Sequence, residues 1–407
     1  MSDMKRVIIR IGSVADIGRG SSPRPITDKK YFENGEIPWI KIADATVSGK
    51  YIYKTKQYVN DLGASYSRKM KPGTLILSAS GSLGIPHFLG VEGCIHDGWI
   101  YMDNIHDIDK QYLYYLLLTM RPYFDNLSYG AAIQNINTSI LSKTKIEVPS
   151  IQSQEKIGLM LSAYDNLIEN NNKRIKLLEQ MTESLYKEWF VRFRFPGYKD
   201  VEFIDGFPKD WEKVKLDDVL NKIATGLNPR KNFVLGEGKN FYVTIKNMAD
   251  NTVYLDDKCD KVNDDAIIKI NKRSDLKIGD LLFSGIGTIG RVCLIDIPTN
   301  NWNISESVFT MRANKKISSE FLYMLLLSQD VQNYCQSKAN GSAQKGIRMG
   351  DLKKYTFLLP TKNVINDFTN QISPILRNVS LLRNENKNLI QQRDMLLPRL
   401  MSGKLEV

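Results

Sequence analysis

The sequence has few of the side chains that build disulfide frameworks, zinc sites or acid–base catalytic centres. In 407 residues there are four cysteines and three histidines. No cysteine has a Cys-x-x-Cys partner, which favours a reduced compartment with buried or incidental thiols over a disulfide framework. The spacing of these residues matches no familiar zinc pattern, so we expect no metal site. Three histidines also leave little material for proton transfer near neutral pH. The residues are Cys94, Cys259, Cys293, Cys335, His87, His96 and His106.

Long apolar runs are also missing. No stretch approaches the roughly 20 uninterrupted apolar residues that a membrane span needs. The first residues, Met1 to Arg6, lead directly into a strand-like segment and lack the apolar core of a signal peptide. We therefore expect a cytoplasmic protein.

Three catalytic signatures are absent. There is no Pro-Pro pair of the kind found in the Asn/Asp-Pro-Pro-aromatic motif of amino-methyltransferases, and no proline precedes an aspartate, as nuclease motifs beginning with Pro-Asp require. No Gly-x-x-x-x-Gly-Lys-Ser/Thr phosphate loop is present, and the glycines between Gly12 and Gly20 lack dinucleotide-binding spacing. We expect the chain to have no catalytic activity alone and to bind no cofactor.

Positive charge, in contrast, is in excess. The 56 Lys and Arg residues outnumber the 45 Asp and Glu residues, which gives a net charge of +11. Both halves of the chain share the excess, so a polyanionic partner is plausible. Excess lysine that only aids solubility is the alternative, and charge alone does not exclude it.

The chain contains a long internal repeat. Residues 71–84 recur as residues 277–290, and the apolar run at 112–118 recurs at 321–327. The offset drifts only from 206 to 211 residues, as small loop insertions would cause. Several matches in the same order indicate a tandem duplication.

Each copy is typical of a mixed domain followed by a long helix. Short β-rich runs alternate with Gly, Pro, Asn and Asp, and one helix is expected near residues 111–120 and again near 319–328. We predict an α+β protein with two similar mixed α/β domains, separated by a pair of long antiparallel helices that form a coiled-coil spacer with approximate two-fold symmetry. The expected boundaries are residues 1–150, 151–194, 195–361 and 362–407.

The two long segments carry one apolar stripe each. Apolar residues recur at steps of three and four from residue 152 to about 190, and from about 364 to 397. Asn171 occupies the first stripe, where a polar residue can set register. Pro374 is expected to kink the second helix, and Pro398 and Gly403 to mark its end. A helix of about 39 residues is ~58 Å long, too long for its own domain to cover, so we favour antiparallel pairing over two unrelated core helices.

Four stretches show a family resemblance. They are residues 185–197 (LYKEWFVRFRFPG), residues 393–403 (RDMLLPRLMSG), residues 37–44 (IPWIKIAD) and residues 130–137 (GAAIQNIN). Over essentially the whole chain the sequence resembles the specificity (S) subunit of type I restriction–modification systems. The second copy departs from the last two motifs, because residues 241–247 lack Pro-Trp and residues 344–347 carry an extra residue. That difference fits a domain that reads a different sequence.

The resemblance implies a function and a set of partners. Such subunits hold two target recognition domains, which each read one half of a split, asymmetric double-stranded DNA site. The helices set the gap between the half-sites and dock modification (methyltransferase) subunits, expected to be two, which bind S-adenosylmethionine and methylate adenine. A translocating and cleaving restriction subunit joins the larger complex. The candidate docking residues on the helices are Tyr164, Ile168, Ile175, Leu178, Leu185, Trp189, Val379, Leu382, Leu389 and Leu396.

Polar loops that carry glycine are the candidate DNA contacts. Arg, Lys, Asn and Gln read base edges, glycine lets the backbone approach a phosphate, and Ser or Thr adds a short donor. For each residue the alternative is a solvated loop charge or a turn that needs a positive φ. Trp39 and Trp99 offer stacking surfaces, although buried core aromatics are the commoner outcome. The candidates are Arg19, Arg24, Lys41, Ser80, Ser82, Gln134, Asn135, Arg230, Lys231, Lys246, Asn247, Thr288, Arg291, Gln344, Lys345 and Arg348.

The rival hypothesis is a coiled-coil scaffold whose globular ends bind proteins. Such a scaffold would bind DNA weakly and without sequence preference, whereas a specificity subunit with its partner would bind one split sequence with a steep salt dependence.

Overall fold

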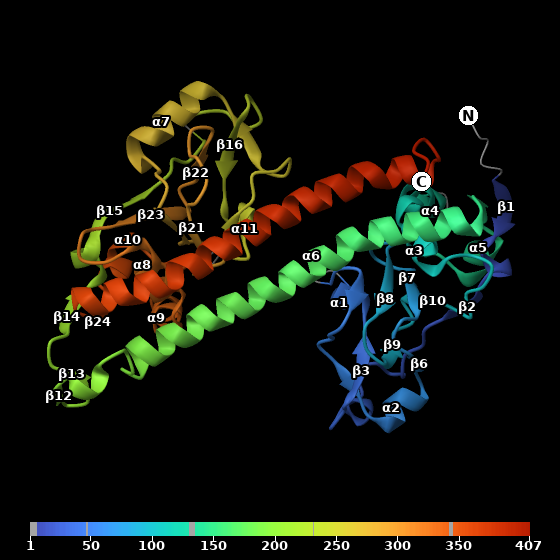
Figure 1. Ribbon diagram of the computed structural model, residues 1–407, viewed down its shortest axis with the longest axis horizontal. Coiled ribbons are helices and arrows are strands. Elements are labelled where there is room, and N and C mark those ends of the chain that lie inside the picture. Colours follow the sequence, from blue (N-terminus) through green and yellow to red (C-terminus); the bar gives the residue numbers. More distant parts are fainter. Residues whose placement is uncertain (1–5, 46–47, 130–134, 231, 342–344) are drawn as a thin grey trace. The chain divides into compact units, whose positions relative to one another are not determined.

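The computed structural model describes residues 6–45, 48–129, 135–230, 232–341 and 345–407. The chain divides into two compact units. Unit 1 comprises Met1–Lys173 and Arg383–Val407, and unit 2 comprises Arg174–Leu382. Two long helices, α6 (Ile151–Tyr186) and α11 (Lys362–Met401), contribute residues to both units (Figure 1).

Unit 1 is built on two sheets. A five-stranded sheet has the order β2-β10-β7-β8-β4, and a four-stranded sheet has the order β5-β3-β9-β6. Strands β1 and β11 form a separate antiparallel pair in which Val7 lies opposite Val148. The strands are β1 (Val7–Arg10), β2 (Asp16–Arg19), β3 (Ile37–Ile40), β4 (Tyr51–Ile52), β5 (Tyr58–Val59), β6 (Arg68–Met70), β7 (Leu75–Ser78), β8 (Pro86–Leu89), β9 (Gly93–Ile95), β10 (Trp99–Asp103) and β11 (Lys145–Val148).

Helices cover the five-stranded sheet of unit 1. The fully buried strand β7 and the apolar face of α3 enclose the core, to which Ile157 and Leu161 of α6 and Leu400 of α11 also contribute. Gly158 allows α6 to approach the start of α3, because a Cβ at this position would lie 2.5 Å from Asp109 Oδ1. The helices are α1 (Ile42–Ala45), α2 (Asp61–Ser65), α3 (Lys110–Thr119), α4 (Arg121–Tyr129) and α5 (Thr138–Lys143).

Unit 2 repeats this plan. Its main sheet has the order β15-β23-β20-β21, a second sheet has the order β19-β16-β22, and β14 pairs with β24. The strands are β12 (Phe203–Ile204), β13 (Phe207–Pro208), β14 (Glu212–Lys215), β15 (Leu220–Thr225), β16 (Asn240–Val243), β17 (Met248–Ala249), β18 (Thr252–Val253), β19 (Asp260–Val262), β20 (Leu281–Ser284), β21 (Val292–Leu294), β22 (Trp302–Ile304), β23 (Val308–Ala313) and β24 (Thr356–Leu359). The helices are α7 (Asp264–Ser274), α8 (Ser319–Leu327), α9 (Gln329–Lys338) and α10 (Met349–Lys353).

The shared topology confirms the predicted fold class of two similar mixed domains and two long helices. Strands β2-β10-β7-β8 correspond to β15-β23-β20-β21, and the parallel pair β3–β9 corresponds to the parallel pair β16–β22. The helices predicted near residues 111–120 and 319–328 are α3 and α8. The approximate two-fold relation between the copies stays a prediction.

The long helices pack against each other in antiparallel fashion within each unit. In unit 1, Asn171 of α6 contacts Glu385 and Asn386 of α11. In unit 2, Ile175 and Leu178 of α6 pack with Val379 and Leu382 of α11. Asn171 therefore lies in the seam, as its place in the apolar stripe predicted.

The prolines of α11 do not end it. The helix continues through Pro374 and through Pro398, and only after Met401 does the chain turn, with Gly403 at a φ of +73°. A proline removes one helical hydrogen bond. Burial of Phe368 and Ile372 before Pro374, and of Leu400 after Pro398, offsets that loss, so the expectation that Pro398 marks the end of the helix is wrong.

Candidate nucleic-acid interface

A pinned hairpin loop recurs in both units. In unit 1 the loop from β7 to β8 is closed by Ser78, whose Oγ donates to the carbonyl of Ser82 and accepts from the Ile85 amide at 2.9 Å. In unit 2, Ser284 Oγ donates to the carbonyl of Thr288 at 2.5 Å and accepts from the Arg291 amide at 2.8 Å. These bonds hold the tips that carry Ser80 and Ser82 in unit 1 and Thr288 in unit 2.

The later polar motif lies beside this loop in both units. In unit 1 the Ile136 amide donates to the carbonyl of Ala79 at 3.0 Å, which places exposed Asn135 next to the loop. In unit 2 the Ile347 amide donates to the carbonyl of Gly285 at 2.8 Å, and the Gly287 amide donates to the carbonyl of Lys345 at 2.8 Å. The structure thus brings Thr288 and Lys345 together, with exposed Arg348 following them in the chain. The predicted residues Gln134, Lys231 and Gln344 lie outside the described residues.

In unit 1 three candidate cations converge on residues 96–98. Arg19 Nε donates to the backbone carbonyl of Asp97 at 2.7 Å, and the Arg24 guanidinium forms an ion pair with the Asp97 carboxylate. Lys41 Nζ lies 5.1 Å from the ring centroid of Trp39, which in turn packs edge-on against His96. The residues of this cluster come from β2, the loop after it, the end of β3 and the β9–β10 connection.

Ser80 belongs to the same surface. A Cβ on Gly98 would lie 2.8 Å from Ser80 Oγ and 3.1 Å from His96 Nδ1, so a larger residue here would displace the Ser80 hydroxyl. Trp39 and Trp99 are buried in the unit, which makes them core residues and leaves the exposed polar groups around them as the candidate contacts.

Unit 2 places different chemistry at the corresponding position. Asn228 Nδ2 donates to Glu306 Oε1 at 2.7 Å, and the Tyr242 hydroxyl, which lies 2.7 Å from the Leu227 carbonyl, is 3.1 Å from Glu306 Oε2. Burial, followed by the nearby Glu306 charge, raises the pKa of Tyr242, so its phenol stays a donor. Arg230 is exposed, and within the described residues its side chain makes no ion pair.

Two candidates of unit 2 are held inside the fold. Arg291 Nη1 donates to the carbonyls of Ile245 and Met248 at 2.9 and 2.5 Å. The Asn247 side chain is buried and caps its own turn by accepting from the Thr244 amide at 3.0 Å. Lys246, between these contacts, remains exposed. The structure therefore gives Arg291 and Asn247 a role in shaping the loop that carries Lys246.

A comparison with protein families decides what this architecture belongs to. The family model described as "Type I restriction modification DNA specificity domain" matches residues 2–180 and 208–392, one match for each copy of the repeat. The chain belongs to this family. The resemblance found in the motifs is thereby confirmed.

Curated members of the specificity family match over the full length. The chain is 25% identical to the type I restriction enzyme MjaIX specificity subunit of Methanocaldococcus jannaschii, over 98% of this chain and 93% of that protein. It is 22% identical to the HindI specificity subunit of Haemophilus influenzae, over the whole of both chains. The crystal structure of a type I S subunit from M. genitalium superimposes with a TM-score of 0.63 at 15% identity, covering 98% of this chain and 97% of that one, which shows a shared fold.

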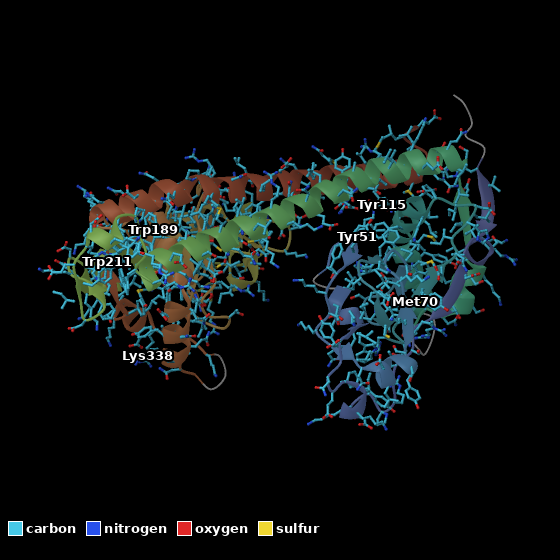
Figure 2. The ribbon with its side chains drawn as sticks, turned by 60° about the horizontal axis from the view of Figure 1, so that its bottom comes forward. Tyr51, Met70, Tyr115, Trp189, Trp211 and Lys338 are labelled. Atoms are coloured by element: carbon cyan, nitrogen blue, oxygen red, sulfur yellow. The ribbon has the colours of Figure 1, made fainter. Side chains whose placement is uncertain are left out.

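The docking candidates of this specificity-family chain lie mostly where the helices touch the rest of the fold. Ile175, Leu178, Val379 and Leu382 form one cluster between the helices. Trp189, labelled in Figure 2, is buried in the core of unit 2, against which Leu185 packs. The remaining candidates are half-buried, and of these Leu396 packs on the core of unit 1; they are Tyr164, Ile168, Leu389 and Leu396.

Other apolar side chains of the same helices are open to solvent. In unit 1 they include Leu159, Leu167 and Met395, and in unit 2 they include Leu177, Met181 and Leu381. The docking candidates were chosen from the apolar stripe, which forms the contact between the helices, whereas these residues lie outside that contact. These side chains are exposed at the surface of their units.

The sequence reasoning also missed two carboxylates. Asp97 and Glu306 were not among the candidates, because basic and amide side chains were sought. The internal repeat could have revealed them, because the two acids lie 209 residues apart, within the range of offsets between the two copies.

Among the described residues, the long helices are too polar to span a membrane and the apolar helices are too short. Nor do the residues seen there group three metal-ligating side chains together.

Proposed function

We propose that this chain is the DNA-specificity subunit of a type I restriction–modification complex, acting in the cytoplasm on double-stranded DNA. Residues 1–150 and 195–361 are its target recognition domains, and residues 151–194 and 362–407 form the spacer helices. Each domain reads one half of a bipartite, asymmetric site. The observation that carries this proposal is the same loop framework with different side chains: Arg24 on Asp97 in one unit, Asn228 on Glu306 in the other.

Charge and exposure support DNA as the partner. The loops around the two hairpins present solvent-exposed cations, which suit phosphate contacts, together with amide and hydroxyl groups, which suit base edges. Exposed Arg19, Arg24, Lys246, Lys345 and Arg348 contribute to the net charge of +11.

The long helices support a spacer and a docking platform. Two modification subunits would dock on the solvent-exposed apolar side chains of α6 and α11, and they would bring S-adenosylmethionine and the chemistry of adenine methylation. A restriction subunit would add translocation and cleavage. In this arrangement the present chain supplies recognition and no catalytic group. The scaffold alternative is not favoured, because the family and the curated relatives are specificity subunits.

Methylation sequencing tests the proposal. The chain is expressed with its cognate modification subunit in a host that lacks adenine methylation, and single-molecule sequencing should return one split motif. The double variant Lys345→Ala, Arg348→Ala should change the second half of that motif and leave the first half intact. Lys404→Ala, an exposed residue in the C-terminal tail, is the control and should change neither half.

Methylation without a split motif, or a loop variant that changes both halves together, contradicts the proposal. Binding of the purified complex provides a second measurement. The logarithm of its affinity should fall steeply with the logarithm of salt concentration, because DNA phosphates are neutralised, whereas a protein scaffold shows weak binding without sequence preference.

A further inference from the structure

Arg24 is held in place at both its backbone and its side chain. The Tyr31 hydroxyl donates to the carbonyl of Arg24 at 3.1 Å, and Pro23 and Pro25 limit the backbone freedom on either side. The guanidinium pairs with Asp97 Oδ2, yet 67% of the side chain stays exposed. An arginine that is restrained but exposed has donors left over for a ligand.

A chain of hydrogen bonds fixes the carboxylate that holds Arg24. The Gly98 amide donates to His96 Nδ1 at 2.9 Å, so the ring proton sits on Nε2. Nε2 lies 3.0 Å from Asp97 Oδ1, which leaves Asp97 Oδ2 for Arg24. Desolvation lowers the pKa of His96, which favours the neutral ring. Both carboxylate oxygens therefore have a defined partner.

Unit 2 has the same backbone arrangement, but its described residues lack a corresponding ion pair between an arginine and a carboxylate. Gly20-Ser-Ser-Pro-Arg24 corresponds to Gly226-Leu-Asn-Pro-Arg230, and Asp97 corresponds to Glu306. Glu306 accepts from the neutral Asn228 amide and lies 3.1 Å from the neutral Tyr242 phenol, and Arg230 makes no ion pair within the described residues. The oriented guanidinium is thus particular to the N-terminal domain and not a requirement of the fold.

We infer that Arg24 reads a guanine in the half-site bound by the N-terminal domain, and that Asp97 and His96 position it. This inference rests on the proposed function. A guanidinium presents two parallel N–H donors that match O6 and N7 of guanine in the major groove. Preorganisation by Asp97 stops the side chain from settling on a phosphate and reduces the side-chain entropy lost on binding.

Conservative variants separate base reading from a phosphate contact. Arg24→Lys keeps the charge but loses the planar fork, and Asp97→Asn keeps the shape but loses the ion pair. In methylation sequencing with the modification subunit, each variant should lower the preference for guanine over the other bases at one position of the first half-site by about 10- to 100-fold. The second half-site should be unchanged. Glu306→Gln is the matched control and should leave that guanine fully specified.

Three results would overturn the inference. The first is a motif unchanged in both Arg24→Lys and Asp97→Asn, in complexes that assemble like wild type. The second is an affinity loss that is equal for all DNA sequences in Arg24→Ala, with a salt slope reduced by about one, because that is the signature of a phosphate contact. The third is a wild-type complex without any split motif, and only this result would also overturn the proposed function.

Discussion

Asp165 of α6 and Arg393 of α11 form an ion pair in unit 1, with Oδ1 and Nη1 2.5 Å apart. Asp165 is buried, and its second oxygen accepts a hydrogen bond from the Tyr115 hydroxyl of α3. Lys50 Nζ completes the cluster, 3.1 Å from Tyr115 Oη and 2.9 Å from Ser162 Oγ. Figure 2 labels Tyr115 and Tyr51, whose rings lie near the Lys50 ammonium. This cluster joins the sheet domain of unit 1 to both long helices.

Removal of the Asp165 charge should destabilise unit 1. Asp165→Asn removes the buried carboxylate beside Arg393 and Lys50 and leaves Arg393 with exposed Asp394 alone, and we expect a loss of about 3 kcal/mol in the free energy of local unfolding. Native-state hydrogen exchange of the α3 amides measures this loss. Asp394→Asn, which removes an exposed partner of Arg393, is the control, with an expected effect below about 0.5 kcal/mol. Equal protection of α3 in the two variants would refute the role given to Asp165.

Lys50 should make stability depend on pH. Burial lowers its pKa from the ordinary value of 10.5 to about 8. Between these two values the unfolded chain holds a proton that the folded chain has released, so the free energy of unfolding rises with pH. From pH 8.5 to 9.5 the wild type should gain about 1 kcal/mol relative to Lys50→Met, in thermal unfolding of the two proteins side by side. Exposed Lys54→Met should behave as wild type, and parallel curves for wild type and Lys50→Met would contradict the prediction.

The asparagines between α6 and α11 should lower stability and at the same time fix the register in which the two helices pair. Asn171 is 1% exposed and donates to Asn386 Oδ1 at 3.1 Å, while its own Oδ1 is buried without a partner among the described residues. The double variant Asn171→Leu, Asn386→Leu should raise the free energy of unfolding by about 1 kcal/mol, because apolar packing replaces an imperfectly paired polar contact. Methylation sequencing should at the same time show more than one spacer length. A less stable variant with a single spacer would contradict this expectation.

The length of the long helices should set the spacer of the DNA site. We expect a four-residue insertion after Lys173 in α6, matched by four residues after Leu382 in α11, to lengthen the pair by slightly more than one turn, ~6 Å. The methylated motif should then gain one or two base pairs between unchanged half-sites. Four residues inserted after Gly236, an exposed loop residue, form the control and should leave the spacer unchanged. Altered half-sites at constant spacing would refute the spacer model.

The internal repeat and the periodicity of apolar residues predicted most of the fold from the sequence. The repeat offset paired β7 and the loop after it with β20 and the loop after it, and α3 with α8, because duplicated segments with the same apolar pattern bury the same faces. The steps of three and four located α6, and Asn171 within its seam. The prolines misled us about the end of α11, since burial of the flanking apolar residues outweighs one missing hydrogen bond.

The chain of amino acids thus determined by itself the duplicated mixed domains, the long helices and the basic loops, because these depend on local pattern and composition. Only the tertiary structure decided which loop residues share a surface. Arg24 meets Asp97 and His96, which lie more than 70 residues further along the chain. Arg291 donates to two backbone carbonyls instead of facing solvent. No local sequence pattern indicates either contact. Hydrogen bonds and burial between distant segments select these partners, and such contacts exist only once the sheets have formed.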